Sequence, residues 1–444
     1  MTSARNRELL ALVPVAILLT AGFAAVFSQE NEQLGNLSLI YGAYFLALCL
    51  VTHIYLRIRL PDADPYLFPL MATLTAFGLV MVYRIDEGLA RDQANWFVLG
   101  LVLFALTIQF LRDYEVLERY RYTIAIGGLL LLLAPRVPGI GQQVNGAYLG
   151  VKIGPLAFQP AEFTKIAIVI FLASYLREHR EVLIVGARRV LGVTLPPLKH
   201  FGPMLVVWGA SMFMLVFIRD LGSSLMFFAA FLALLYVATG RFSFVVIGMA
   251  MFLVGAWFFA STVPHVHERV EIWLHPYEDP QGSGYQILNS IFAQADGGLF
   301  GKGFGEALIT VPGTDNSLLP AAQTDMIYAL IVNEVGLFGA VGVVLVYMLV
   351  AARGFKIALI AGDGFSKLLA TGLTAVFAIQ AFVIIGGVTR VIPLTGVTLP
   401  FISYGGSSIV ANFVLLALLL LISDRARREA AEPAGRMAAL GAPA

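Results

Sequence analysis

Long hydrophobic runs separated by short polar connections repeat along the whole chain. A run of about 18 to 25 apolar residues is long enough for an α-helix to cross a bilayer. One polar interval, from Thr262 to Asp325, is far longer than the others and is rich in glycine, proline and charge. The pattern predicts about twelve spanning helices, near residues 9–28, 37–56, 66–83, 95–111, 122–133, 159–176, 201–218, 221–240, 242–261, 326–351, 368–388 and 396–423.

The composition supports a membrane protein and excludes an ordinary soluble one. Hydrophobic residues make up 59% of the chain and charged residues 13%, well below the charged fraction of soluble domains. We therefore predict an all-α polytopic membrane protein. The first run is of full length and lacks a small-residue cleavage site, so we expect a true span rather than a signal peptide. Cys49 is the single cysteine and excludes an intrachain disulfide.

Lysine and arginine are concentrated at the N-terminus, in every second connection and in the tail. Because such basic loops stay in the cytoplasm, we predict that both termini are cytoplasmic and that the interval Thr262–Asp325 faces outward. The formal net charge of +1 gives no indication of a nucleic-acid partner, and none is expected.

Asp279 is the main candidate for chemistry in the outward interval. It lies in the sequence HPYEDPQGSG, from His275 to Gly284, and Asp-Pro followed by glycines is typical of a turn. One interpretation is a turn-forming aspartate. The other is a carboxylate held on a rigid turn above the bilayer, near apolar surface, where it acts as a general base.

The rest of the outward interval predicts a short helix and a glycine-rich loop. Apolar residues follow the spacing i, i+3, i+4, i+7 within residues 285–296, which predicts an amphipathic helix in the membrane interface. Its apolar face would hold Leu288, Ile291, Phe292 and Ala295. The loop 297–305 lacks the strand and helix of a nucleotide site. It is either a flexible loop or a set of backbone amides that meet a pyrophosphate together with Lys302.

Glu162 and Lys165 lie three residues apart at the start of a predicted span, in the segment FQPAEFTK. This spacing places both on one helix face. A charge at membrane depth costs about 2.5 to 3.5 kcal/mol on insertion scales, so both should face the bundle interior or a wet cavity. They are either functional groups or an ion pair that sets the position of the helix.

Other charged residues at span ends have simpler explanations. Asp220, and Asp325 after Thr324, are predicted to be helix N-caps. Glu334 interrupts a span and leaves the same two alternatives open as Glu162. Arg390 is an outward cation expected to pair with Glu334 or with a ligand phosphate.

The entry to the last span is interrupted by proline and glycine, in the segment GVTLPFISYGGSS of residues 396–408. This composition predicts an irregular backbone, which is tolerated at membrane depth only where it is buried in protein or lines a cavity. Ser403 and Ser407 are candidate polar contacts for a ligand in that position.

Together these segments resemble the SEDS family (shape, elongation, division and sporulation), the RodA and FtsW membrane glycosyltransferases. They follow the family's order and spacing from Tyr66 to Ser423, and two additional N-terminal spans make the RodA branch of actinobacteria the most similar. The matching segments are FQPAEFTK (158–165), RDLGSS (219–224), EDPQGSGYQI (278–287), GGLFGKG (297–303), TDMIYALIVNEVG (324–336) and GVTLPFISYGGSS (396–408).

The resemblance implies a domain plan and a function. An extra helix pair (1–60) would precede a ten-helix core (61–424), with a catalytic outward loop (262–325) and a disordered cytoplasmic tail (425–444). The implied activity is polymerisation of lipid II into peptidoglycan strands at the outer face of the cytoplasmic membrane during cell elongation. The implied partners are a class B penicillin-binding protein, which is a transpeptidase, and the cell-elongation machinery. The alternatives are a lipid II flippase, a division-type polymerase of the FtsW kind, and a non-enzymatic scaffold.

The resemblance also assigns site residues. Asp279 matches the family's essential aspartate, and Glu162 and Lys165 match its helix-borne acid and base pair. The chain departs from the family at Tyr148, where many members have a basic residue, so one or both basic contacts there are absent or displaced to Lys152. No tightly bound cofactor is expected, and a divalent cation such as Mg²⁺ or Mn²⁺ is compatible with the chemistry. The expected contacts to substrate or pyrophosphate are Glu162, Lys165, Lys152, Arg219, Lys302, Glu334, Arg390, Ser403 and Ser407.

Overall fold

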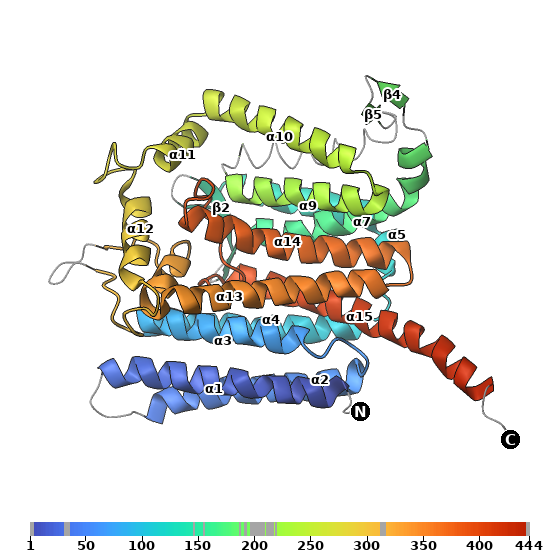
Figure 1. Cartoon of the computed structure of the whole chain (residues 1–444), viewed down its shortest axis with the longest axis horizontal. Coiled ribbons are helices and arrows are strands. Elements are labelled where there is room, and N and C mark those ends of the chain that lie inside the picture. The colour runs from blue at the N-terminus through green and yellow to red at the C-terminus, as the bar shows by residue number, and fades with distance from the viewer. Residues whose placement is uncertain are drawn as a thin grey trace.

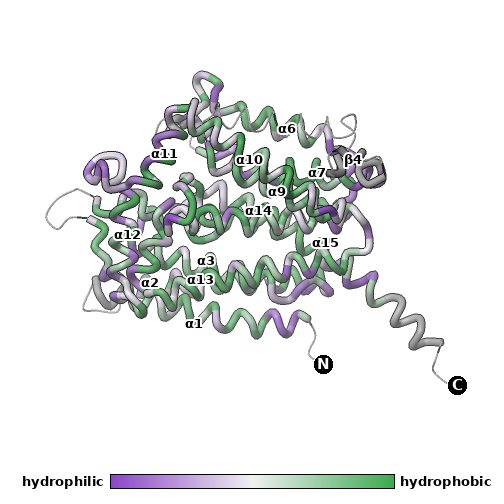
Figure 2. Tube along the Cα trace, turned by 45° about the horizontal axis from the view of Figure 1, so that its top comes forward, coloured by the Kyte–Doolittle hydropathy of each residue, from purple (hydrophilic) through white to green (hydrophobic). Residues whose placement is uncertain are grey.

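The computed structural model describes residues 4–30, 36–144, 147–153, 156–185, 188–190, 193–195, 209, 217, 220–310 and 317–440. Long helices run side by side, and a group of shorter elements that includes α12 closes one end of the bundle (Figure 1). We refer to that end as the loop end. The opposite end, where α1 begins and α15 ends, is the termini end. Figure 2 shows hydrophobic residues along the bundle helices and hydrophilic residues gathered towards the two ends.

The elements follow one another as a helical chain with two small sheets. The helices are α1 (Ala4–Glu30), α2 (Asn36–Arg59), α3 (Leu67–Ile85), α4 (Glu87–Phe110), α5 (Val116–Arg119), α6 (Arg121–Leu133), the 3₁₀ helix η1 (Ala134–Arg136), α7 (Pro160–Val185), α9 (Leu221–Thr239), α10 (Phe242–Thr262), α11 (Pro264–Leu274), α12 (Tyr285–Gly297), α13 (Ile327–Ile360), α14 (Gly364–Val388) and α15 (Gly406–Leu440). The strands are β1 (Gly141–Val144), β2 (Ala147–Ile153), β3 (Leu156–Phe158), β4 (Arg188–Val190) and β5 (Val193–Leu195).

Nine helices among the described residues are long and apolar enough to cross a membrane, namely α1, α2, α3, α4, α9, α10, α13, α14 and α15. Helices α6 and α7 fall on two more of the predicted spans. The predicted span 201–218 lies almost entirely outside the described residues. The all-α polytopic architecture predicted from the hydrophobic runs is confirmed.

A small antiparallel sheet, ordered β1-β2-β3, precedes α7, where only a connection was expected. Gly141 pairs with Val151, which in turn pairs with Phe158 on the third strand. The sheet therefore leads the chain to Pro160, the first residue of α7, where a proline costs no helical hydrogen bond.

Burial separates central helices from peripheral ones. Within an apolar stretch of 18 residues in each helix, the share buried inside the protein is 89% in α15 and 78% in α14, but only 6% in α10. Helices α14 and α15 therefore form the centre of the bundle. Buried polar side chains in the middle of these helices, such as Gln380 and Asn412, therefore face other protein groups rather than lipid.

The N-terminal pair α1–α2 packs on the outside of the core, next to α3 (Figure 1). The buried face of α1 has helical spacing and consists of Leu12, Val15, Leu19, Phe23 and Val26. Near the termini end, Arg5 donates to Glu8 and to the carbonyl of Ala63. The Nδ1 atom of His53 lies 2.7 Å from Glu8. We refer to Arg5, Glu8 and His53, all buried, as the polar lock.

Beyond Asp424, α15 continues as a helix to Leu440, whereas the sequence predicted a disordered tail from residue 425. Contacts near the start of this extension account for the difference. Asp64 is buried and pairs with Arg353 at 2.7 Å and with Arg427 at 2.6 Å. Arg425 pairs with Glu429 one helical turn later, at 2.8 Å. These pairs and the alanine-rich composition favour the helix.

Candidate functional site

The short helix predicted within residues 285–296 is confirmed as α12 (Tyr285–Gly297), which crosses the loop end and packs against α13 (Figure 1). Its buried side is shifted from the predicted one. Ile287 and Leu288 are buried, whereas Phe292 is 54% exposed. The difference arises because α13, rather than lipid alone, decides which face of α12 turns inward.

Asp279 lies in the turn between α11 and α12, and its carboxylate is fixed by that turn. The N–H of Gly282 donates to Oδ1 at 3.0 Å, and the N–H of Ser283 donates to Oδ2 at 2.8 Å. A Cβ at position 282 would lie 2.1 Å from Oδ2, so a side chain there would push the Asp279 carboxylate out of this position. The turn-forming role of Asp279 is therefore confirmed.

The surroundings of Asp279 are not the apolar ones that we expected, because its side chain is exposed. Each carboxylate oxygen has two lone pairs, and the turn uses one on each. The carboxylate is thus held in place while both oxygens keep acceptor capacity towards the outside. A turn-forming role and a general-base role are compatible in this geometry.

Arg390 connects the end of α14 to the beginning of the Asp279 turn. Its Nε donates to the carbonyl of Trp273 and its Nη2 to that of Leu274, both at 2.8 Å, and the Trp273 indole donates back to the Arg390 carbonyl at 3.1 Å. The backbone of Arg390 has a φ of +62°, which is strained for a residue with a side chain. The cation lies at the C-terminus of α11, where it is favoured.

Glu334 pairs with Arg84 of α3 and not with Arg390, so that predicted pairing is wrong. The Glu334 side chain is fully buried, and Arg84 also donates to the carbonyl of Gly305 at 2.8 Å. Two residues later the helix breaks at Gly336, whose φ is +68°. The sequence could not show this pairing because Arg84 and Glu334 meet only through packing of α3 on α13.

The glycine-rich loop 297–305 is folded onto the break in α13. The N–H groups of Gly301, Lys302 and Gly303 donate to the carbonyls of Gly297, Asn333 and Glu334 at 2.8 to 2.9 Å. The Lys302 ammonium pairs with Asp296 at 2.8 Å, and both side chains are exposed. These amides are therefore occupied by protein carbonyls and do not form a phosphate cradle.

Glu162 and Lys165 are brought together with polar groups of the two central helices. Lys165 donates to Glu162 at 2.6 Å, to the side-chain oxygen of Gln380 on α14 at 2.7 Å, and to that of Asn412 on α15 at 3.1 Å. The amide of Gln380 donates to Glu162 at 3.1 Å. We refer to these four side chains, all at least 95% buried, as the buried charge network.

The irregular backbone predicted over residues 396–408 is confirmed as far as residue 405, since α15 begins at Gly406, and polar side chains satisfy it. The Ser403 hydroxyl donates to Thr324 O at 2.7 Å and accepts from Leu399 N–H at 2.9 Å. Ser407 accepts from Gln159 N–H at 2.8 Å. Ser403 and Ser407, both predicted to contact a ligand, therefore form hydrogen bonds with backbone groups instead, as burial at membrane depth requires.

Lys152, on β2, is exposed. Arg219 lies outside the described residues.

Sequence reasoning missed Arg269 and gave Asp325 the wrong role. The N-cap of α13 is Met326, without a capping side chain, so the predicted cap by Asp325 is wrong. Asp325 Oδ2 and Arg269 Nη2 both lie within 4 Å of the point where a Cβ on Gly396 would be, at 3.5 and 3.9 Å. Burial raises the pKa of Asp325 to about 6, and the Arg269 charge opposes that rise.

Asp220 caps α9 as predicted, accepting from Ser223 N–H at 3.0 Å. It is buried, and burial raises its pKa above the ordinary range, with Glu162 adding to the rise and Arg269 opposing it. The acids Glu162, Asp220 and Asp325 and the cation Arg269 thus form an electrostatically connected group, although no three His, Cys, Asp or Glu side chains in the described part of the chain are grouped as a metal site.

Comparison with known proteins gives consistent matches over this architecture. The family model described as "Cell cycle protein" (FtsW/RodA/SpoVE) matches residues 65–428. The peptidoglycan glycosyltransferase RodA of Mycobacterium tuberculosis is 40% identical over 96% of this chain and 91% of its own length. The probable peptidoglycan glycosyltransferase FtsW of Geobacter metallireducens is 31% identical over 83% of this chain and 97% of its own length.

A solved structure has the same fold. It comes from work on the structural coordination of polymerization and crosslinking by a peptidoglycan synthase complex. The match has a TM-score of 0.65 and 28% identity, and covers 82% of this chain and 98% of the other. The buried charge network, the broken entry to α15 and the turn between α11 and α12 all lie within the matched residues 65–428. This chain belongs to the FtsW/RodA/SpoVE family of membrane proteins.

Proposed function

We propose that this chain is a peptidoglycan glycosyltransferase that polymerises lipid II into glycan strands during cell elongation. The supporting observation is the Asp279 carboxylate, which is exposed at the loop end and held by two backbone N–H groups. The higher identity to a protein named RodA than to one named FtsW supports elongation over division. We place the loop end outside the cytoplasmic membrane and both termini inside, because the connections at the termini end carry most of the lysine and arginine.

Asp279 would act as the general base. It accepts the proton of the acceptor GlcNAc 4-hydroxyl while that oxygen forms a bond to C1 of the donor MurNAc. The bond between C1 and the pyrophosphate oxygen breaks, and undecaprenyl pyrophosphate leaves with the electron pair. A single displacement converts the α-linked donor into a β-linked strand. The fixed turn supplies orientation, which is a large part of such catalysis.

The buried charge network would position helices rather than bind substrate. All three donor positions of the Lys165 ammonium are directed at protein oxygens. The ion pair between Lys165 and Glu162 therefore joins α7 to α14 and α15, and Lys165 has no donor left for a pyrophosphate. The better candidates for binding the pyrophosphate are two other cations. They are Arg269, which lies beside Asp325, and the exposed Lys152.

The residues described here do not offer a preformed divalent-cation site. Among them, Asp325 and Asp220 lie near the Arg269 cation, and both are N-terminal neighbours of helices rather than a converging set of ligands. We therefore assign no step of the proposed reaction to a metal ion.

The partner would be a class B penicillin-binding protein. The similar solved structure belongs to work on a complex that coordinates polymerization with crosslinking, and a strand made by this chain needs a transpeptidase to be crosslinked. Activity measurements should therefore use the chain together with its transpeptidase.

The test is strand synthesis from labelled lipid II by the purified chain with its partner. We expect Asp279→Asn to abolish synthesis while folding and partner binding remain. Asp296→Asn is the matched control, since Asp296 is also an exposed aspartate of the loop end. Wild-type rates in Asp279→Asn would exclude the general-base role. Absence of strands from the wild type with its correct partner, together with lipid II transport that survives Asp279→Asn, would favour the flippase alternative.

A further inference from the structure

A pocket lined by aromatic rings lies between α1, α2, α3 and α4, near the loop end. Its volume is about 220 Å³, whereas a single water molecule needs only about 10 to 15 Å³, so the pocket has room for a group of several heavy atoms. We refer to it as the aromatic pocket. Each of the four helices contributes at least one of its six rings, which are those of Phe23, Tyr41, Tyr44, Phe45, Tyr83 and Phe97.

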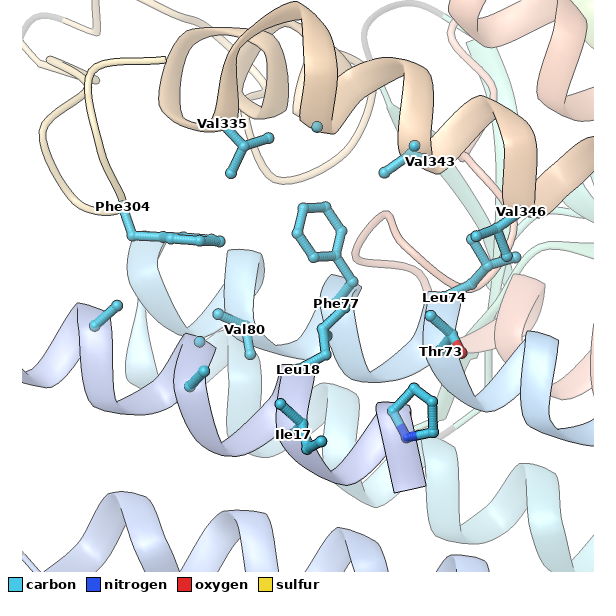
Figure 3. Close-up of a pocket in the computed structure, with 16 residues that line it drawn as sticks. Ile17, Leu18, Thr73, Leu74, Phe77, Val80, Phe304, Val335, Val343 and Val346 are labelled. Atoms are coloured by element: carbon cyan, nitrogen blue, oxygen red, sulfur yellow. The ribbon is translucent and has the colours of Figure 1, made fainter. Parts of the chain in front are cut away.

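The aromatic pocket differs from a larger groove between α1, α3 and α13, which Figure 3 shows. The side chains that line the groove are apolar apart from Thr73, whose hydroxyl donates to the carbonyl of Pro69 at 2.8 Å. Such a lining does not distinguish one hydrocarbon chain from another. The aromatic pocket also has the charged side chains of Glu87 and Arg91 in its lining, and these can select a ligand by its chemistry.

The aromatic pocket is apolar at depth and charged at its rim. Phe23, Phe45 and Phe97 are all at least 95% buried, whereas Glu87 and Arg91 are exposed. The ten helical steps from Glu87 to Phe97 correspond to about 15 Å, and the headgroup layer on each side of a bilayer is about 5 to 8 Å thick. The pocket therefore extends from the headgroup layer into the hydrocarbon, a depth that suits an amphiphile.

The rim carries one charge of each sign. Arg91 Nη2 lies 3.2 Å from Glu87 Oε1, and the hydroxyl of Tyr41 donates to the same oxygen at 3.3 Å. Oε2 of Glu87 accepts no hydrogen bond from the part of the chain that the structure describes. The Arg91 and Glu87 side chains are 65% and 53% exposed, and so exposed an ion pair adds little to stability. A zwitterionic ligand can replace this pair and leave neither charge without a partner.

The tyrosine rings favour an ammonium group as the positive end of that ligand. The ring centroids of Tyr41 and Tyr83 are 6.1 Å apart, and Tyr83 packs edge to face on Phe23 at 5.3 Å. A cation is attracted to an aromatic ring within about 6 Å of the ring centroid. Because Tyr41 also contacts Glu87, an ammonium at the carboxylate would meet aromatic rings as well.

The order of groups along α4 identifies the class of ligand. Starting at the loop end, the pocket lining on this helix presents the carboxylate of Glu87, then the guanidinium of Arg91 one helical turn deeper, then the ring of Phe97. A phosphatidylethanolamine molecule carries the complementary groups in the same order, with the ammonium outermost, then the phosphate, then the acyl chains. Phosphatidylglycerol has no ammonium and would leave Glu87 facing an anion.

We propose that the aromatic pocket binds phosphatidylethanolamine, in the leaflet at the loop end. The rings from α1 and α2 lie before residue 65, where the family match begins, and Tyr83 and Phe97 lie after it. The lipid would therefore bind at the junction between the N-terminal pair and the matched core, and connect them. This site does not depend on the proposed glycosyltransferase activity.

The test is native mass spectrometry of the full-length chain, titrated in detergent with dioleoyl phosphatidylethanolamine or with dioleoyl phosphatidylglycerol. The acyl chains are the same, and we expect several-fold higher retention of phosphatidylethanolamine. Glu87→Gln and Tyr44→Leu should each reduce this preference several-fold, and both positions are exposed, so folding should not suffer. The matched controls are Glu306→Gln, at an exposed glutamate of the loop end, and Tyr236→Leu, at an exposed tyrosine of α9. Both controls should keep the preference.

Thermal unfolding gives a second readout. A ligand that binds only the folded chain raises its Tm, so phosphatidylethanolamine should raise the wild-type Tm more than phosphatidylglycerol does. This difference should disappear in Glu87→Gln.

Three results would overturn the proposal. Equal retention of the two lipids by the wild type, a result that needs no variant to fold, would show that the rings are an ordinary interfacial aromatic cluster. Equal affinity for water-soluble phosphorylethanolamine would show that the apolar depth of the pocket contributes nothing and that the ligand is not a lipid. An undiminished preference in Glu87→Gln would show that the carboxylate does not bind the headgroup.

Discussion

The Asp279 turn and the buried charge network contain the same kinds of side chain in opposite environments. In the network, Lys165 and Glu162 are almost completely buried and hold each other, Gln380 and Asn412. In the turn, Asp279 is exposed and contacts only backbone N–H groups of its own loop. Lys165 has no donor left for a ligand, whereas both oxygens of Asp279 keep acceptor capacity and are exposed. The comparison indicates that the buried charged side chains of the network stabilise helix packing. The carboxylate that is fixed in position but exposed is the candidate for catalysis.

The largest expected effect is on the network, from Lys165→Met. Loss of one partner leaves Glu162 buried and uncompensated, which costs about 3 to 5 kcal/mol. Thermal unfolding in detergent should show a large fall in Tm, partly restored in the double variant Glu162→Gln/Lys165→Met. Lys302→Met is the matched control, because its pair with Asp296 is exposed and contributes at most about 1 kcal/mol. An unchanged Tm in Lys165→Met would contradict the structural role of the network.

The turn should respond in activity and not in stability, and Gly282→Ala tests this. The new Cβ would displace the carboxylate from its position 2.1 Å away. We expect strand synthesis to fall by about 100-fold, within the range of a lost general base, with Tm nearly unchanged. Ser283→Ala is the control, since it keeps the N–H that donates to Asp279. Full activity in Gly282→Ala would show that the observed carboxylate position is not needed.

Arg390 should show an intermediate effect, because it connects the bundle to the turn. In Arg390→Ala two charge-assisted hydrogen bonds to the end of α11 are lost, a cost of about 1 to 3 kcal/mol. We expect faster hydrogen exchange over residues 273–284, a lower kcat, and partial rescue by Arg390→Lys. Unchanged exchange with lower activity would instead indicate direct contact between Arg390 and a ligand.

The smallest expected effect is a pH dependence from Asp325. Its pKa in the folded protein is about 6, above the ordinary value of 3.8, so the folded state binds the extra proton between these values. Stability from this group is therefore present below about pH 4 and is lost as pH rises to about 6. The Tm of the wild type, measured relative to that of Asp325→Asn, should fall as the pH rises through this window. Above the window the difference between the two Tm values should stay constant. A difference that does not vary with pH would contradict the raised pKa.

The spanning helices and α12 were predictable because their periodicity is local. A run long enough to cross the bilayer, or an apolar spacing such as that around Leu288, is set by a bilayer or an interface and needs no knowledge of neighbours. The same is true of the Asp220 cap, where acceptor and donor are three residues apart.

Contacts between distant helices were not predictable. Arg84 and Glu334 are 250 residues apart, and Arg390 was a reasonable but incorrect partner for the same acid. Asp325 has the sequence setting of a cap, but α13 is capped at Met326 and the half-buried Asp325 carboxylate lies near Arg269 instead. The serines at 403 and 407 had the composition of a ligand site and are used by nearby backbone. In each case the partner is chosen by packing.

The polar lock has a consequence for how the N-terminal pair can be gained or lost. In water, an added helix pair is held by apolar burial, and its removal exposes that surface at a large cost. In a bilayer, lipid tails replace the contacts of Leu19 or Phe23 almost equally well. The hydrogen bonds that leave the pair, from Arg5 to the carbonyl of Ala63 and from Tyr55 to that of Ala105, thus provide much of the specific attachment. In evolutionary terms the α1–α2 pair is a module, because a few polar substitutions near one membrane face are enough to attach it to the helical core or to detach it.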